Sequence, residues 1–203
     1  MVAIKSFLLA AVALLASPTL AWDKQTVVDN LENLRQDASS ILTQVRSVNF
    51  LNGNLIAVGQ GPFPDIVDGV RRLGVIALSY SQVYEGAEGN ITSDADAEDI
   101  ATQFSATRLE INIVLGQLIG KANLFNVPLV GIPIIFSSIS EALVFAKPRV
   151  ARALPNSLIL LLDAPSEDAE ATIMEDGDSL ARLFDDAIAA WQVGIPLNPP
   201  GSK

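Results

Sequence analysis

Acidic side chains are densest in the run DADAED, residues 94–99. Carboxylates at alternate positions are typical of the first half of a calcium-binding loop. The rest of that pattern fails, because Asp99 stands where the sharp turn needs glycine and Ser105 stands where a bidentate glutamate should close the site. Acids at the start of a helix interact favourably with its dipole. The run therefore predicts a helix N-terminus and no metal site.

The sequence lacks the side chains of the commonest catalytic sites. It has no histidine and no cysteine, which removes Ser–His and Cys–His nucleophilic pairs. It has no G-x-S-x-G motif, and GQGP at 59–62 lacks the strand and the lysine of a phosphate-binding loop. Its 23 acidic residues offer carboxylate pairs for glycoside hydrolysis, but acids on helix surfaces are usually solvated. We expect no enzymatic activity and no cofactor; an acid-dependent hydrolase is the least favoured alternative.

Apolar residues recur at intervals of three and four in four stretches, which predicts amphipathic helices. The stretches are 26–48, 64–86, 93–122 and 166–193. Extra apolar residues widen the stripe of the third stretch, so we expect this helix to be central; they are Leu109, Ile113 and Ile119.

Two of these helices have recognisable start signals. Thr26 and Asp29 have the spacing of a capping box for the first helix. Ser166 is the expected N-cap of the last helix, with acids following in its positive first turn. Between the first two helices, the Asn-, Gly- and Pro-rich segment 49–65 is expected to be a loop.

The segment 134–162 contains Pro148 and Pro155, so it forms either two helices or one kinked helix, and the sequence leaves both open. No stretch has the period-two alternation of a β-strand. We therefore predict an all-α, up-and-down bundle of about five helices. Without cysteine it has no disulfides, and packing must stabilise it.

The N-terminus MVAIKSFLLAAVALLASPTLAWD has one lysine, an apolar core and small residues before Trp22. This pattern is typical of a secretory signal peptide, residues 1–21, cleaved after Ala21. We expect one helical domain over 22–193 and a disordered tail over 194–203, LNPPGSK being its polar, Pro-rich part. The product would be secreted, either released outside the cell or held in the cell wall.

Charge narrows the class of partner. With 23 acidic and 13 basic residues the net charge is −10, which repels phosphate backbones and argues against nucleic acid as a partner. The negative charge also disfavours binding to anionic lipid head groups. Asn90-Ile91-Thr92 is an N-glycosylation motif between two expected helices, so Asn90 is a candidate glycan site.

No residue between Lys121 and Glu141 is charged. Pro128, Gly131 and Pro133 interrupt the run and no basic flank accompanies it, so we expect no transmembrane span. The simplest interpretation is a segment of the bundle core. Because the run offers almost no polar face, the sequence leaves open a second interpretation, that it lines a cavity or an exposed apolar patch.

Three stretches carry a resemblance to a known family. They are SDADAEDIATQFSATRLEINIVLGQLIGKANLF (93–125), ALPNSLILLLDAP (153–165) and SLARLFDDAIAAW (179–191). Their order and their F-D-x-A-I-A-A-aromatic ending resemble the fungal hydrophobic surface-binding protein A family, which also contains cell-wall galactomannoproteins. This chain departs from the family in its fourth segment, which is nearly uncharged and contains Pro148.

The resemblance implies a secreted, non-enzymatic helical protein that adsorbs to hydrophobic surfaces, in some members assisting a secreted esterase, and in others binds fatty acids in an apolar tunnel. We therefore predict binding of a fatty-acid-like ligand or a hydrophobic surface; the alternative is a structural cell-wall mannoprotein without ligand. The expected apolar lining comprises Phe104, Ile111, Leu115, Leu118, Ile135, Phe136, Ile139, Leu143, Leu180, Phe184 and Ile188. Candidates for the ligand's head group are Ser137, Ser138, Ser140, Arg149 and Arg152.

Overall fold

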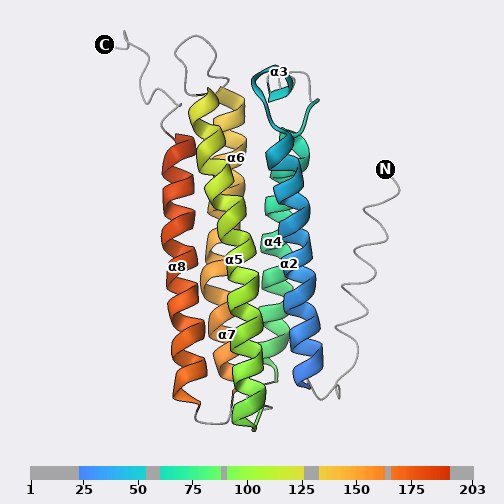
Figure 1. Cartoon of the computed structure of the whole chain (residues 1–203), viewed down its shortest axis with the longest axis vertical. Coiled ribbons are helices and arrows are strands. Elements are labelled where there is room, and N and C mark those ends of the chain that lie inside the picture. Colours follow the sequence, from blue (N-terminus) through green and yellow to red (C-terminus); the bar gives the residue numbers. More distant parts are fainter. Residues whose placement is uncertain (1–22, 54–59, 88–90, 126–132, 163–165, 193–203) are drawn as a thin grey trace.

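The structure is a computed structural model, shown in Figure 1, and it describes residues 23–53, 60–87, 91–125, 133–162 and 166–192. Its helices are α2 (Lys24–Ser47), α3 (Phe50–Gly53), α4 (Phe63–Glu85), α5 (Asp94–Phe125), α6 (Pro133–Pro148), the π-helical turn η2 (Arg149–Ala153), α7 (Leu154–Leu161) and α8 (Glu167–Gln192). No strand occurs among these residues, and one isolated bridge pairs Ile91 with Leu162.

The helices run alternately up and down the long axis of the molecule (Figure 1). α2, α5 and α8 run one way, and α4 and the α6–η2–α7 segment run the other. α5 packs along both α2 and α8, whereas α4 packs against α2 and the α6–α7 segment. The predicted all-α, up-and-down bundle of about five helices is therefore confirmed, with α3 as an additional single turn.

The apolar face predicted for the first helix is confirmed. Every member is buried in α2 or just after it: Val27, Leu31, Leu34, Ala38, Ile41, Val45 and Val48. The predicted start of this helix is wrong. Asp23 is the N-cap, and its carboxylate accepts hydrogen bonds from Thr26 N at 2.9 Å and Thr26 Oγ1 at 2.8 Å. Asp29 instead accepts from Gln25 Nε2 at 2.8 Å, so there is no Thr26–Asp29 capping box.

The expected loop at 49–65 contains the single turn α3. Asn49 Oδ1 accepts hydrogen bonds from the backbone N–H groups of Leu51 at 2.9 Å and Asn52 at 3.0 Å, which holds the start of this turn. Gly53 ends it against the ring of Phe125: a Cβ at Gly53 would lie 2.3 Å from Phe125 Cζ. Glycine therefore allows α3 to close on the end of α5.

The central position expected for α5 is confirmed, but the reason given for it is not. Leu109 and Ile113 are 53% and 44% exposed, so the residues that widen the apolar stripe face outward. Ile119 alone of the three packs partly against the core. α5 is central because its main stripe contacts α2 on one side and α8 on the other.

The segment around the two prolines is one continuous helical segment, which decides between the alternatives left by the sequence. Pro148 ends α6, the five residues of η2 follow, and α7 begins at Leu154. The N–H of Leu154 donates to the carbonyl of Arg149, five residues earlier, as in a π-turn. α8 lies close to this turn, since a Cβ on Gly177 would be 3.0 Å from Pro155 Cγ and 3.3 Å from Ala151 O.

The predicted N-cap of α8 is confirmed, because Ser166 Oγ accepts from the N–H of Ala169 at 3.4 Å. The expected signal peptide, the expected C-terminal tail, Asn90 and residues 126–132 of the uncharged run lie outside the described residues. Within the described ranges, no helix has the length and apolar character that crossing a bilayer requires.

Candidate functional site

The predicted apolar lining is brought together in the interior of the bundle. All its members except Ile188 are buried, and Ile188 is half-buried against them. They come from α5, α6 and α8 and belong to one continuous apolar core. From Ile135 onward, the uncharged run forms part of the bundle core, as in the first of its two interpretations. Ile135, Phe136 and Ile139 are fully buried.

The five head-group candidates lie at two separate places on one helical segment. Ser137 and Ser138 are half-buried near the start of α6, and Ser140 is buried. The Arg149 guanidinium lies 3.7 Å from the centre of the Phe145 ring and donates to the Phe145 carbonyl, whereas Arg152 is exposed. A helical rise of about 1.5 Å per residue puts Ser138 and Arg149 roughly 16 Å apart along the segment. The serines and the arginines therefore cannot serve the same head group.

An aromatic cluster occupies the end of the bundle at which α4 and α6 begin and α5 and α8 finish (Figure 1). The Phe63 ring lies edge-on to Phe125, with centroids 5.3 Å apart, and edge-on to Trp191 at 5.9 Å. Phe136 lies 5.2 Å from Trp191. Such edge-to-face contacts add to the energy of burial. These four buried residues join four helices at one end, and Phe136 alone of them belongs to the predicted lining.

Trp191 brings the only polar atom of these four side chains. The residue is fully buried, and its indole Nε1 has no hydrogen-bond partner among the described residues. No Lys or Arg is buried in the part of the chain that the structure describes. The aromatic cluster thus contains a hydrogen-bond donor in surroundings without a buried positive charge.

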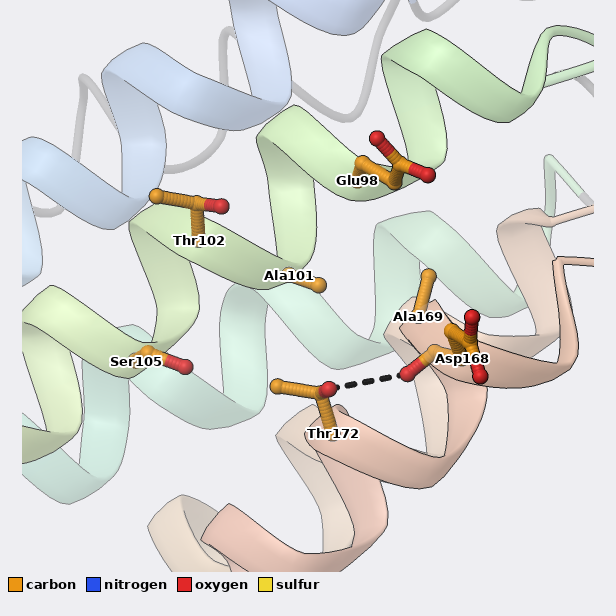
Figure 2. Close-up of a pocket in the computed structure, with 7 residues that line it drawn as sticks. All are labelled: Glu98, Ala101, Thr102, Ser105, Asp168, Ala169 and Thr172. Carbon is orange, nitrogen blue, oxygen red and sulfur yellow. Dashed lines mark hydrogen bonds between the residues drawn. The ribbon is translucent and has the colours of Figure 1, made fainter.

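A shallow groove of about 380 Å³ lies between the N-terminal halves of α5 and α8 (Figure 2). Its walls are Glu98, Ala101, Thr102, Ser105, Asp168, Ala169 and Thr172. The Thr172 hydroxyl donates to the Asp168 carbonyl of its own helix at 2.8 Å. With two carboxylates, three hydroxyls and no cation, the lining disfavours an anionic ligand. Fatty acids therefore do not suit this groove.

A buried polar contact lies next to the groove and links the same two helices. Asp176 on α8 is 7% exposed and accepts a short hydrogen bond from the Ser105 hydroxyl on α5. Arg108 Nε lies 2.8 Å from Asp176 Oδ1, although its N–H does not point at that oxygen, so this contact is an ion pair and not a hydrogen bond. Ser105 and Asp176 are thus engaged with each other and act as structural links.

The acidic run at 94–99 lies at the start of α5, as predicted from the helix dipole. Lys24 of α2 pairs with Asp96 at 3.2 Å and with Asp99 at 2.7 Å. The hydrogen bond to Asp99 raises the pKa of the Lys24 ammonium. Among the described residues no group of three His, Cys, Asp or Glu side chains is arranged to hold a metal ion.

Comparisons with known proteins find a solved structure with a similar fold. A scan against protein-family models and a search of curated proteins find no match. Among solved structures, the crystal structure of AfMP4p in complex with palmitic acid superposes with a TM-score of 0.64. The superposition covers 83% of this chain and 99% of AfMP4p, at 16% sequence identity. The chain therefore shares its helical fold with the AfMP4p chain of that crystal structure over nearly the whole of the latter.

Proposed function

We propose that this protein is a non-catalytic binding protein that holds an apolar, fatty-acid-like ligand between its helices. The observation that carries the proposal is the match to a bundle whose crystal structure contains palmitic acid. The continuous apolar core formed by α5, α6 and α8 supports it. An acyl chain buried there would gain about 0.8 kcal/mol per methylene transferred from water.

The ligand must enter a close-packed interior, so core side chains or helices must move to admit it. The α6–η2–α7 segment is best suited to move. It contains a π-turn and, beyond its first residue, the two prolines Pro148 and Pro155, which interrupt the regular hydrogen-bond ladder of a helix. Displacement of this segment would open the core along Ile139 and Leu143 on one side and Phe184 on the other.

Secretion belongs to the same proposal and is supported by the signal-like residues 1–21. A secreted lipid-binding protein would meet its ligand outside the cell or in the cell wall. A secreted esterase is a partner that fits this location, because it would release acyl chains as ligands.

A second candidate function is adsorption to hydrophobic surfaces, and one observation favours it. Leu109, Ile113 and Leu124 on α5 are 53%, 44% and 44% exposed. Intervals of four and eleven residues place them on one face, since three helical turns take about 11 residues. Gly116 and Gly120 lie between them, and no described atom would touch a Cβ on either glycine. This apolar α5 face, defined by these five residues, is open to a surface.

Two variants, one in the core and one on the α5 face, distinguish ligand binding from surface adsorption. Palmitic acid is titrated into the purified protein, and adsorption to polystyrene beads is measured in parallel. Ile139→Glu places a charge in the core and should abolish saturable binding of palmitic acid. Leu109→Glu makes the same change on the α5 face and should leave that binding intact while reducing adsorption.

Circular dichroism must show that both variants remain helical. Absence of saturable binding by the wild type would overturn the proposed ligand. If adsorption is also absent, the alternative of a structural wall mannoprotein without ligand remains.

A further inference from the structure

The indole N–H of Trp191 is a buried hydrogen-bond donor, and no described residue accepts from it. Its side chain is fully buried, and its Nε1 makes no hydrogen bond within the described ranges. Indole nitrogen donates but does not accept, so only an acceptor can satisfy it. Buried polar groups in proteins are almost always paired, and an unpaired one calls for an explanation.

The surroundings of Trp191 define the kind of acceptor. The rings of Phe63 and Phe136 flank it with centroids at 5.9 Å and 5.2 Å, so the immediate surroundings are aromatic. None of the buried polar residues in the described part of the chain is a cation. They are Ser81, Thr107, Ser140, Ser157, Ser166 and Asp176. A carboxylate buried without a positive partner is strongly disfavoured, whereas an uncharged carbonyl needs one donor.

We infer that the Trp191 Nε1–H binds the carbonyl oxygen of an uncharged acyl group, as in a fatty-acid ester or a protonated fatty acid. This inference rests on the proposed function and adds the polar end of the ligand to it. The acyl chain extends from Trp191 along the buried face of α8, formed by Ala187, Phe184 and Leu180. From Trp191 to Leu180 this face measures roughly 16 Å.

The test compares ligands that differ only at the acceptor. Methyl laurate has a carbonyl, and tetradecane has the same number of chain atoms without one. Competition against a fluorescent fatty-acid analogue should show methyl laurate binding about fivefold tighter than tetradecane. In Trp191→Phe, which keeps an aromatic ring but has no donor, the ratio should fall to about one. Leu34→Val, which changes the core on α2 away from the proposed ligand path and removes no donor, should leave the ratio unchanged.

A spectroscopic readout on the wild type covers the case in which Trp191→Phe does not fold. The indole N–H resonance of Trp191 should move downfield with methyl laurate and not with tetradecane. Trp22 is the other tryptophan of the chain, and Trp22→Phe assigns the two signals.

Binding of neither ligand would overturn the proposed function. Equal binding of the two with an unmoved indole signal would overturn the role of Trp191 and leave the proposed function standing. Laurate is the third ligand, added at about pH 8, where its carboxyl group is ionised. If laurate binds more tightly than methyl laurate, the acceptor is a carboxylate and the inference of an uncharged ligand is wrong.

Discussion

Arg108 on α5 and Asp176 on α8 form an ion pair across the helix interface, with Arg108 Nε 2.8 Å from Asp176 Oδ1. The side chains are 23% and 10% exposed, so this pair is more buried than the Lys147–Asp185 pair, in which Asp185 is 63% exposed. Ser105 supplies a hydrogen bond to the second Asp176 oxygen. The carboxylate of Asp176 therefore holds two α5 side chains, Arg108 through an ion pair and Ser105 through a hydrogen bond.

Removing this carboxylate should destabilise the bundle. Asp176→Ala leaves Arg108 without its partner, and we expect the free energy of unfolding to fall by about 3 kcal/mol. Chemical denaturation followed by circular dichroism measures this loss. Asp185→Ala breaks a solvated pair and should change stability by less than about 1 kcal/mol.

The double variant Arg108→Met/Asp176→Leu distinguishes two causes of the expected destabilisation: loss of the attraction between the two charges, and the cost of leaving the Arg108 charge unpaired. It removes both charges and keeps the volume, so it should recover most of the stability that Asp176→Ala loses. If the double variant is as unstable as Asp176→Ala, the ion pair itself stabilises the interface more than an apolar contact would.

Two helical glycines offer a matched test of close packing. A Cβ added to Gly177 would lie 3.0 Å from Pro155 Cγ and 3.3 Å from Ala151 O. A Cβ added to Gly120 would have no described atom within 4 Å. Gly177→Leu should therefore destabilise by about 1–3 kcal/mol through overpacking. Gly120→Leu should stabilise by a few tenths to about 1 kcal/mol, because leucine favours a helix more than glycine does. Thermal denaturation of both variants checks the pair, and equal effects would contradict the packing of α8 on the π-turn.

Glu32 should make folding stability depend on acidic pH. Hydrogen bonds from Arg35, then from Gln36, lower the pKa of the Glu32 carboxyl from 4.5 to about 2. A pKa depressed in the folded state stabilises the fold above 4.5, and this contribution is lost as pH falls toward 2.

Glu32 is partly solvated, so the effect is less than about 1 kcal/mol. Urea denaturation across this pH range should show a smaller loss of stability in Glu32→Gln than in wild type. A carboxyl titration of Glu32 by NMR with an ordinary midpoint would contradict the expected hydrogen bonds.

The proposed absence of catalysis is tested directly with ester substrates. Because the chain has neither histidine nor cysteine, we expect the purified protein to leave lipid and polyester substrates intact. Product release is measured by titration of liberated acid. Hydrolysis that disappears on replacement of one serine or aspartate would show that the protein is an enzyme.

The helical faces could be predicted from sequence because burial follows the 3.6-residue period, and every apolar position expected in α2 is buried. The start of α2 was harder to place. Asp23 and Thr26 are both common near helix starts, and only the backbone decides which of them is the N-cap. In α5, Leu109 and Ile113 show that apolar character alone does not establish burial.

The candidate site was only partly predictable. Residues of the lining were recognised as apolar faces, which the fold then brought together. Trp191 lies in the stretch 166–193 that the sequence predicts as an amphipathic helix, but its unpaired donor depends on how the ends of α4, α6 and α8 meet. Contacts between segments distant in sequence leave no local pattern, so this feature required the structure.

The π-turn η2 lets α6 and α7 share one buried side. Ala146, Val150, Leu154 and Leu158 are all buried and follow one another at intervals of four. In a regular helix each such interval overshoots a full turn by about 40°, so three of them would rotate the last residue by about 120° away from the first. The wider turn absorbs that drift. A regular helix with the same number of residues would therefore turn Leu158 out of the core, whereas a regular helix with one residue deleted from η2 would keep it there, because about 11 residues make three turns. The extra residue of η2 can thus be accommodated only as a local irregularity of the helix.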